Sequence, residues 1–110
     1  MKGLIIKEPW IDLILNGQKT WEIRGSRTKL RGEIALIKSK SGKVFGTAEI
    51  DDCIELDLNI YQDSFRYHCI PETTFLPYKR TYAWVLKNPK RYNEPFPYNH
   101  PQGAVIWVNL

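Results

Sequence analysis

Four polar side chains within six residues make up the segment of this chain best suited to chemistry. Lys19, Thr20, Glu22 and Arg24 follow directly on Gly17, which is typical of the end of a helix. A buried lysine can act as a base, with a carboxylate to orient it and a hydroxyl as nucleophile. Lys19 and Arg24 can instead bind a phosphate while Glu22 holds the arginine. A strand with an ordinary solvated face would show the same alternation, so spacing alone leaves three interpretations open.

Aromatic and histidine side chains supply further candidates. Trp10 follows Pro9 at a predicted helix start, where an indole can line a cleft, and stacking a base on such a ring contributes about 1–3 kcal/mol. The other three tryptophans lie in apolar runs and are expected in the core: Trp21, Trp84 and Trp107. His68 and His100 lack metal-binding spacing, and we expect His100 to form hydrogen bonds within its loop. No metal or cofactor is predicted.

The surrounding sequence predicts the elements that hold these side chains. Leu4–Ile6 is an apolar run typical of a strand, and apolar residues at helical spacing predict a helix from Pro9 to Asn16. After Gly17 the period changes to two. Thr20, Glu22 and Arg24 are therefore expected on one face of a strand, with Trp21 and Ile23 on the other.

The rest of the chain predicts an α+β, mostly β fold, a compact and mostly antiparallel β-barrel of five or six strands with one or two short helices. The further strands are expected at Gly32–Ile37, Val44–Ile50, Tyr82–Leu86 and Ala104–Val108. Gly46 suggests a bulge in its strand. Residues Ile60–Tyr67 suggest a short helix. A loop is expected around the four prolines Pro89, Pro95, Pro97 and Pro101. Tyr98 in this proline-rich segment is expected to be partly exposed.

Size and composition predict one domain over residues 1–110, because 43% hydrophobic residues suffice for a single core. No run of 18 apolar residues and no signal-peptide pattern occurs, so we expect a cytoplasmic protein without a membrane partner. Cys53 and Cys69 are expected to be reduced and buried. The sequence makes no prediction of oligomeric state.

The net charge of +4 is unevenly distributed. Residues 1–50 carry ten Lys/Arg against five Asp/Glu, whereas residues 51–72 carry one against six. The loop that follows the predicted strand with Thr20, Glu22 and Arg24 contains Ser26, Arg27, Lys29 and Arg31. Such a charged face suits a polyanion such as RNA or another single-stranded nucleic acid, although solvated lysines would give the same balance.

Several of these features resemble the ASCH domain, a member of the PUA-like β-barrel superfamily. They are Pro9-Trp10, the pattern Gly17-x-Lys19-x-x-Glu22-x-Arg24, and the endings Tyr82–Leu86 and Pro101–Trp107. The resemblance implies a cleft beside the first helix that binds RNA or a modified nucleoside. The ligand-binding candidates are Trp10, Lys19, Glu22, Arg24, Ser26, Arg27, Lys29, His68, Tyr98 and His100.

The same resemblance implies an alternative activity. A small bacterial amidohydrolase of the superfamily acts on N4-acetylcytidine through a lysine, a threonine and a glutamate. Its lysine matches Lys19, its threonine falls where this chain has Glu22, and Thr20 lies two positions earlier on the same face. Alignment on His68 places Glu72 at its glutamate. The alternative is thus an amidohydrolase or ribonuclease with Lys19 as general base, Glu22 or Glu72 as its partner, and Thr20 as nucleophile or oxyanion donor.

Overall fold

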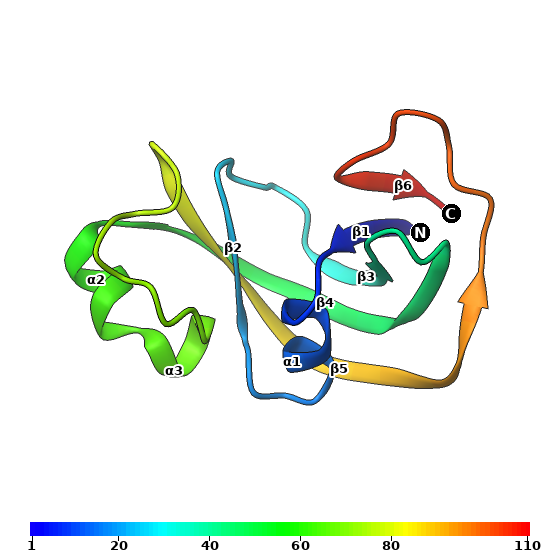
Figure 1. The fold of residues 1–110 in the computed structure, drawn as a ribbon, viewed down its shortest axis with the longest axis horizontal. Coiled ribbons are helices and arrows are strands. Elements are labelled where there is room, and N and C mark those ends of the chain that lie inside the picture. The colour runs from blue at the N-terminus through cyan, green and yellow to red at the C-terminus, as the bar shows by residue number, and fades with distance from the viewer.

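Six strands form one sheet, in the order β2-β5-β4-β3-β1-β6 (Figure 1). The computed structural model describes residues 1–110. The strands are β1 (Lys2–Ile6), β2 (Trp21–Arg24), β3 (Gly32–Lys38), β4 (Lys43–Leu56), β5 (Thr81–Pro97) and β6 (Trp107–Asn109). The helices are α1 (Trp10–Leu15), α2 (Leu58–Asp63) and α3 (Phe65–His68). None of them is long and apolar enough to span a membrane.

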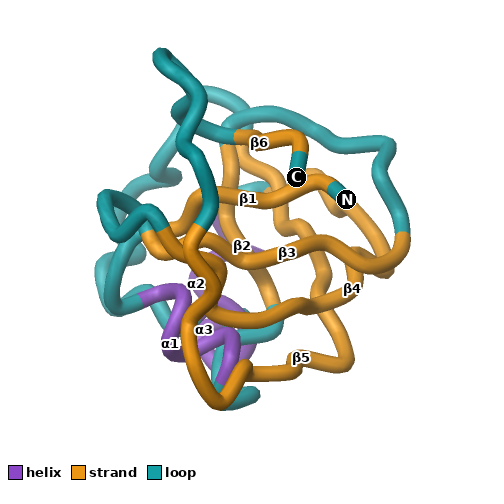
Figure 2. Tube along the Cα trace, turned by 90° about the vertical axis from the view of Figure 1, so that its right-hand side faces the viewer, coloured by secondary structure: helices purple, strands orange, loops and turns teal.

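The sheet confirms the predicted mostly β, α+β class with six strands, and it is mixed rather than purely antiparallel. β1 runs parallel to β3, and the other pairs are antiparallel. The strands at its two ends, β2 and β6, do not pair with each other, so the sheet is not closed. Both chain termini lie together beside β1 and β6 (Figure 2).

Helix α1 ends where the sequence predicts and packs against β3, β4 and β5. Ile11, Ile14 and Leu15 on one side of the helix are buried in the main core. Gly17 has a φ of +86°, a conformation that residues with a side chain rarely adopt, and it turns the chain from α1 toward β2. The helix end therefore fixes where Lys19 enters the fold.

The proline-rich segment was expected to be a loop, and this prediction is wrong: β5 continues through Pro89, Pro95 and Pro97. β2 pairs only with Tyr82–Val85, so farther along β5 has β4 on one side alone. A proline lacks the N–H that a second neighbouring strand would need, and it is tolerated at such an open edge. Pro101 does lie in a loop.

Other boundaries also differ from expectation. Residues 104–106 are irregular, so β6 covers only the end of the strand predicted there. The predicted helix near residues 60–67 is split into α2 and α3 at Ser64. The bulge at Gly46 is confirmed, because the β4–β5 register shifts there and a Cβ would collide with the Lys90 carbonyl. Cys53 and Cys69 are free thiols but only half-buried, which corrects the prediction of burial.

Candidate functional site

A cleft of about 380 Å³ lies beside α1 and β2 and brings together four of the candidate residues. Trp10 comes from the start of α1, Lys19 from the turn after the helix, and Glu22 and Arg24 from β2. The alternation along β2 places Glu22 and Arg24 on the same face, as the period of two predicts. This cavity is called the cleft below.

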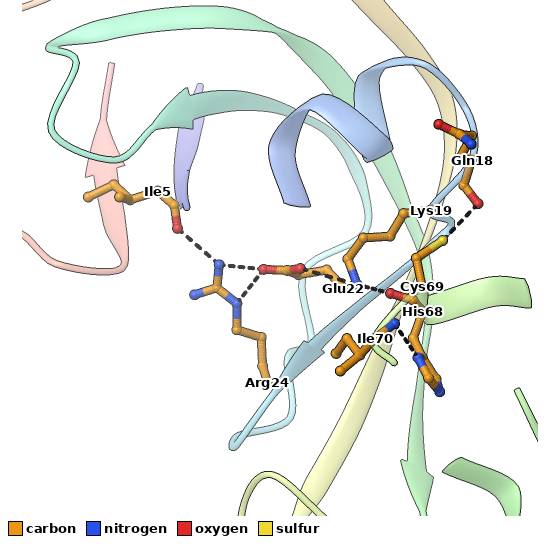
Figure 3. Close-up of polar contacts among 8 residues, drawn as sticks. All are labelled: Ile5, Gln18, Lys19, Glu22, Arg24, His68, Cys69 and Ile70. Atoms are coloured by element: carbon orange, nitrogen blue, oxygen red, sulfur yellow. Dashed lines mark hydrogen bonds and ion pairs between the residues drawn. The ribbon is translucent and has the colours of Figure 1, made fainter. Parts of the chain in front are cut away.

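Lys19 is almost fully buried, with 2% of its surface exposed, although it borders the cleft. Its backbone N–H donates to the carbonyl of Leu13 at the end of α1. Its Nζ donates to the backbone carbonyl of His68 at 2.6 Å (Figure 3). The same nitrogen lies 5.1 Å from the centre of the Trp10 ring. Burial lowers the pKa of Lys19 to about 8, against the opposing effect of the Glu22 carboxylate.

Glu22 links the two cations of the motif. Its Oε2 accepts hydrogen bonds from Nε of Arg24 at 2.9 Å and pairs with Nη2 at 2.7 Å, while Oε1 lies 3.9 Å from Nζ of Lys19. Nη2 of Arg24 also donates to the carbonyl of Ile5 on β1. Nη1 of Arg24 has no hydrogen-bond partner within the chain, and Figure 3 shows it pointing away from Glu22. One guanidinium nitrogen therefore remains available to a ligand.

His68 lies behind the cleft and not in it. The side chain is completely buried and stacked on Tyr61. Nδ1 accepts a hydrogen bond from the backbone N–H of Ile70 at 2.9 Å, so Nε2 carries the proton and donates to the Tyr61 carbonyl at 2.7 Å. Both ring nitrogens are thus occupied, and His68 contributes its carbonyl oxygen to Lys19.

We expect the protein to lose stability as pH falls below about 6.5, the ordinary pKa of histidine. Burial, aided by the nearby Lys19 ammonium, lowers the pKa of His68 in the folded state. The unfolded chain then binds a proton that the folded chain does not. The free energy of unfolding therefore falls by up to about 1.4 kcal/mol for each pH unit below this value. Urea unfolding across this range should show the loss in the wild type and in His100→Asn. His68→Asn, which keeps an acceptor for Ile70, should lack this component, and an unchanged pH profile would contradict the assignment.

The other candidates of the hydrolase interpretation lie outside the cleft. Thr20 is held by its backbone, which donates to the Tyr67 carbonyl and accepts from Leu86, and its hydroxyl has no hydrogen bond within the chain. Glu72 is exposed, and its Oε1 accepts from the backbone N–H of Thr74 in its own turn. Neither of them is brought together with Lys19 and Glu22.

The remaining candidates occupy other surfaces. Arg27 and Lys29 line a separate cavity in which Glu55 pairs with Arg27 at 3.7 Å. Ser26 is exposed and its carbonyl accepts from the Trp84 indole. Tyr98 and His100 line a third cavity, called the outer groove below. The predicted loop hydrogen bonds of His100 are present, to Tyr98 at 2.7 Å and to the Ala104 carbonyl at 2.9 Å.

Sequence reasoning missed several residues that border the cleft, notably Lys7, Ile70 and Tyr78. A signal for Tyr78 exists in Gly25, which directly follows the motif arginine. A Cβ at Gly25 would lie 2.9 Å from the Tyr78 ring, so glycine lets that ring pack against the end of β2. The sequence around Gly25 does not reveal that its packing partner is Tyr78, which only the folded structure identifies.

Comparison with known proteins identifies the family and the fold. The model of the ASCH domain matches residues 4–96 of the chain. The crystal structure of the ASCH protein from Zymomonas mobilis has a TM-score of 0.76 and 17% identity, covering 99% of this chain and 86% of that one. The crystal structure of a serine-to-alanine mutant of that protein has a TM-score of 0.74 and 18% identity, and the match covers 99% of this chain and 87% of the mutant chain. These neighbours have the predicted PUA-like fold. None of the curated proteins matches the chain.

Proposed function

Because the chain belongs to the ASCH domain family, which is broadly linked to RNA binding, we propose that its cleft binds a base of RNA or of a modified nucleoside. The observation that carries this proposal is the cluster of buried Lys19 and Glu22 with half-buried Arg24 beside the Trp10 indole. A base has a flat face for stacking and an edge of donors and acceptors. The cleft offers a counterpart to both.

The polar groups of the cluster suit a base edge. Nη1 of Arg24 is a donor without a hydrogen bond within the chain. Oε1 of Glu22 is an acceptor without a hydrogen bond, because Nζ of Lys19 lies 3.9 Å away from it. A donor and an acceptor that are fixed side by side can pair with a complementary base edge and reject the wrong one. Because Arg24 and Glu22 hold each other, little side-chain freedom is lost when a ligand binds.

The charge of the cleft also favours a nucleic acid. Lys7, Lys19 and Arg24 face a single lining carboxylate, that of Glu22. The cleft is thus positive on balance, which attracts a phosphate-bearing ligand and makes its binding sensitive to salt. We expect free nucleosides to bind with little salt dependence and single-stranded RNA with a steep one.

Titration calorimetry with a panel of ordinary and modified nucleosides, including N4-acetylcytidine, and with short RNAs tests this proposal. Trp10→Ala should weaken binding about 5- to 150-fold, because stacking on an aromatic ring contributes about 1–3 kcal/mol per base. The control is Tyr92→Ala, which removes an exposed aromatic ring outside the cleft. Absence of binding across the panel, or equal effects of the two variants, would overturn the proposal.

A hydrolase remains the second candidate on one specific observation, the lowered pKa of Lys19. At a pKa of about 8 a useful fraction of this amine is neutral near pH 7 and can accept a proton. Because Thr20 does not line the cleft, the nucleophile in this mechanism is water, activated by Lys19 with Glu22 beside it. Turnover of N4-acetylcytidine or short RNA that survives Lys19→Met would exclude this mechanism.

A further inference from the structure

The outer groove adjoins the cleft. It has a volume of about 540 Å³, and four residues line both cavities: Ile5, Lys7, Ser39 and Val105. A ligand pocket typically measures about 300–1,000 Å³, so the cleft alone is near the lower limit and the outer groove more than doubles the space. The free space therefore extends well beyond one base.

The junction between the two cavities combines a cation with an apolar side chain. Lys7 is exposed, and its ammonium has no hydrogen-bond or ion-pair partner within the chain. Val105 lines the same junction and is 75% exposed, so its apolar side chain is open to a ligand. A phosphate would neutralise Lys7, while a sugar or base would cover Val105.

The far wall of the outer groove is fixed by a hydrogen-bond chain. The Tyr98 hydroxyl donates to Nδ1 of His100 at 2.7 Å, and Nε2 of His100 donates to the Ala104 carbonyl at 2.9 Å. Both aromatic rings are thereby held in place against the loop that carries Val105. Lys40 lines the same groove, is exposed and has no ion-pair partner. The groove is thus lined by two fixed aromatic rings and two free cations.

We propose that the outer groove binds the nucleotide next to the one whose base occupies the cleft, with the linking phosphate on Lys7. The ligand is then a single-stranded RNA of at least two nucleotides and not a free nucleoside. This inference rests on the proposed function, since it requires a base in the cleft.

The other basic cavity is a poorer path for the strand. It shares no lining residue with the cleft, and two of its cations are already paired, Arg27 with Glu55 and Arg31 with Asp52. A phosphate there would have to compete with these carboxylates. Lys29 is the cation of that cavity without an ion-pair partner. Replacing Lys29 therefore tests whether the strand follows this alternative path.

The test compares the affinities of the ordinary nucleosides, their 3′- and 5′-monophosphates and all dinucleoside monophosphates of the same bases, at low and at physiological salt. At least one dinucleoside monophosphate should bind about tenfold more tightly than its nucleosides, the ratio expected for one charge-assisted contact. Its affinity should also fall with salt, with a logarithmic slope of about −0.7 for one phosphate.

Lys7→Gln should abolish both the tighter binding of the dinucleoside monophosphate relative to its nucleosides and the dependence of its affinity on salt. Lys90→Gln is the charge-matched control, since Lys90 is exposed on β5 and lines neither cavity. If nucleosides bind but dinucleoside monophosphates bind no more tightly, the inference is wrong and the proposed function stands. If Lys29→Gln removes the preference instead, the strand follows the other cavity and the inference is also wrong. If nothing binds, the proposed function itself fails.

Discussion

Replacing Glu22 by glutamine is expected to destabilise the protein by about 3 kcal/mol, the low end of the range for removing one partner of a buried ion pair. Glu22 is 5% exposed and its carboxylate lies between the Lys19 ammonium and the Arg24 guanidinium. Without that charge, two largely buried cations face each other with no anion between them. We also expect the pKa of Lys19 to fall further, because Glu22 is the main group that raises it.

Urea unfolding measures the effect as a shift of the midpoint of about 1 M or more. Glu55→Gln is a matched control, because Glu55 also contacts two cations, Arg27 at 3.7 Å and Arg80 at 3.5 Å. These side chains are exposed, and water screens exposed pairs, so the control should shift the midpoint only slightly. Equal shifts in the two variants would show that burial adds nothing to the Glu22 contacts.

The local part of the candidate site could be predicted from the sequence. The stop at Gly17 fixes the end of α1, and the period of two that follows places Glu22 and Arg24 on one face. Both rules depend only on neighbouring residues. The position of Trp10 at the helix start also follows from neighbouring residues, and the structure places Trp10, Glu22 and Arg24 at one cavity.

The long-range part of the site could not be predicted in this way. Lys19 is buried because a carbonyl 49 residues away, that of His68, accepts its hydrogen bond. That carbonyl is positioned by the His68 ring, whose two nitrogens bind the backbone of Tyr61 and Ile70. The residue type of His68 suggests chemistry, whereas the tertiary contacts give it a structural role. No pattern near Lys19 contains this information.

The proline-rich part of β5 shows how tertiary context changes a local rule. Proline removes a backbone donor, which predicts a loop when no neighbouring strand is specified. The structure leaves one side of β5 unpaired beyond Leu86, so the missing donor costs little there. The pairing of β2 with only the first part of β5 decides the outcome, and that pairing depends on the length of β2, which is four residues.

Lys19 distinguishes the two candidate functions through the sign of a pH dependence. A lysine that binds a ligand as a donor must be protonated, so affinity should fall as pH rises through the pKa of about 8. A lysine that acts as a general base must be neutral, so turnover should rise with pH and level off above that value. Nζ of Lys19 donates a hydrogen bond within the chain to the His68 carbonyl alone and borders the cleft, so it has donors left for a base beside Arg24. We therefore expect the first result: affinity for a nucleoside that binds should fall on the alkaline side.

Lys19→Met should weaken nucleoside binding by roughly 10- to 100-fold, as expected for loss of a hydrogen bond from a charged donor, and should remove the alkaline fall in affinity. Methionine has a similar length, and the cost of losing the donor to the His68 carbonyl is partly offset by removing a buried ammonium. Circular dichroism verifies that the variant is folded. Lys87→Met removes an exposed lysine paired with Asp51 at 2.9 Å and should keep wild-type affinity and pH dependence. If the alkaline fall persists without Lys19, another group titrates there and the role of Lys19 as a donor is refuted.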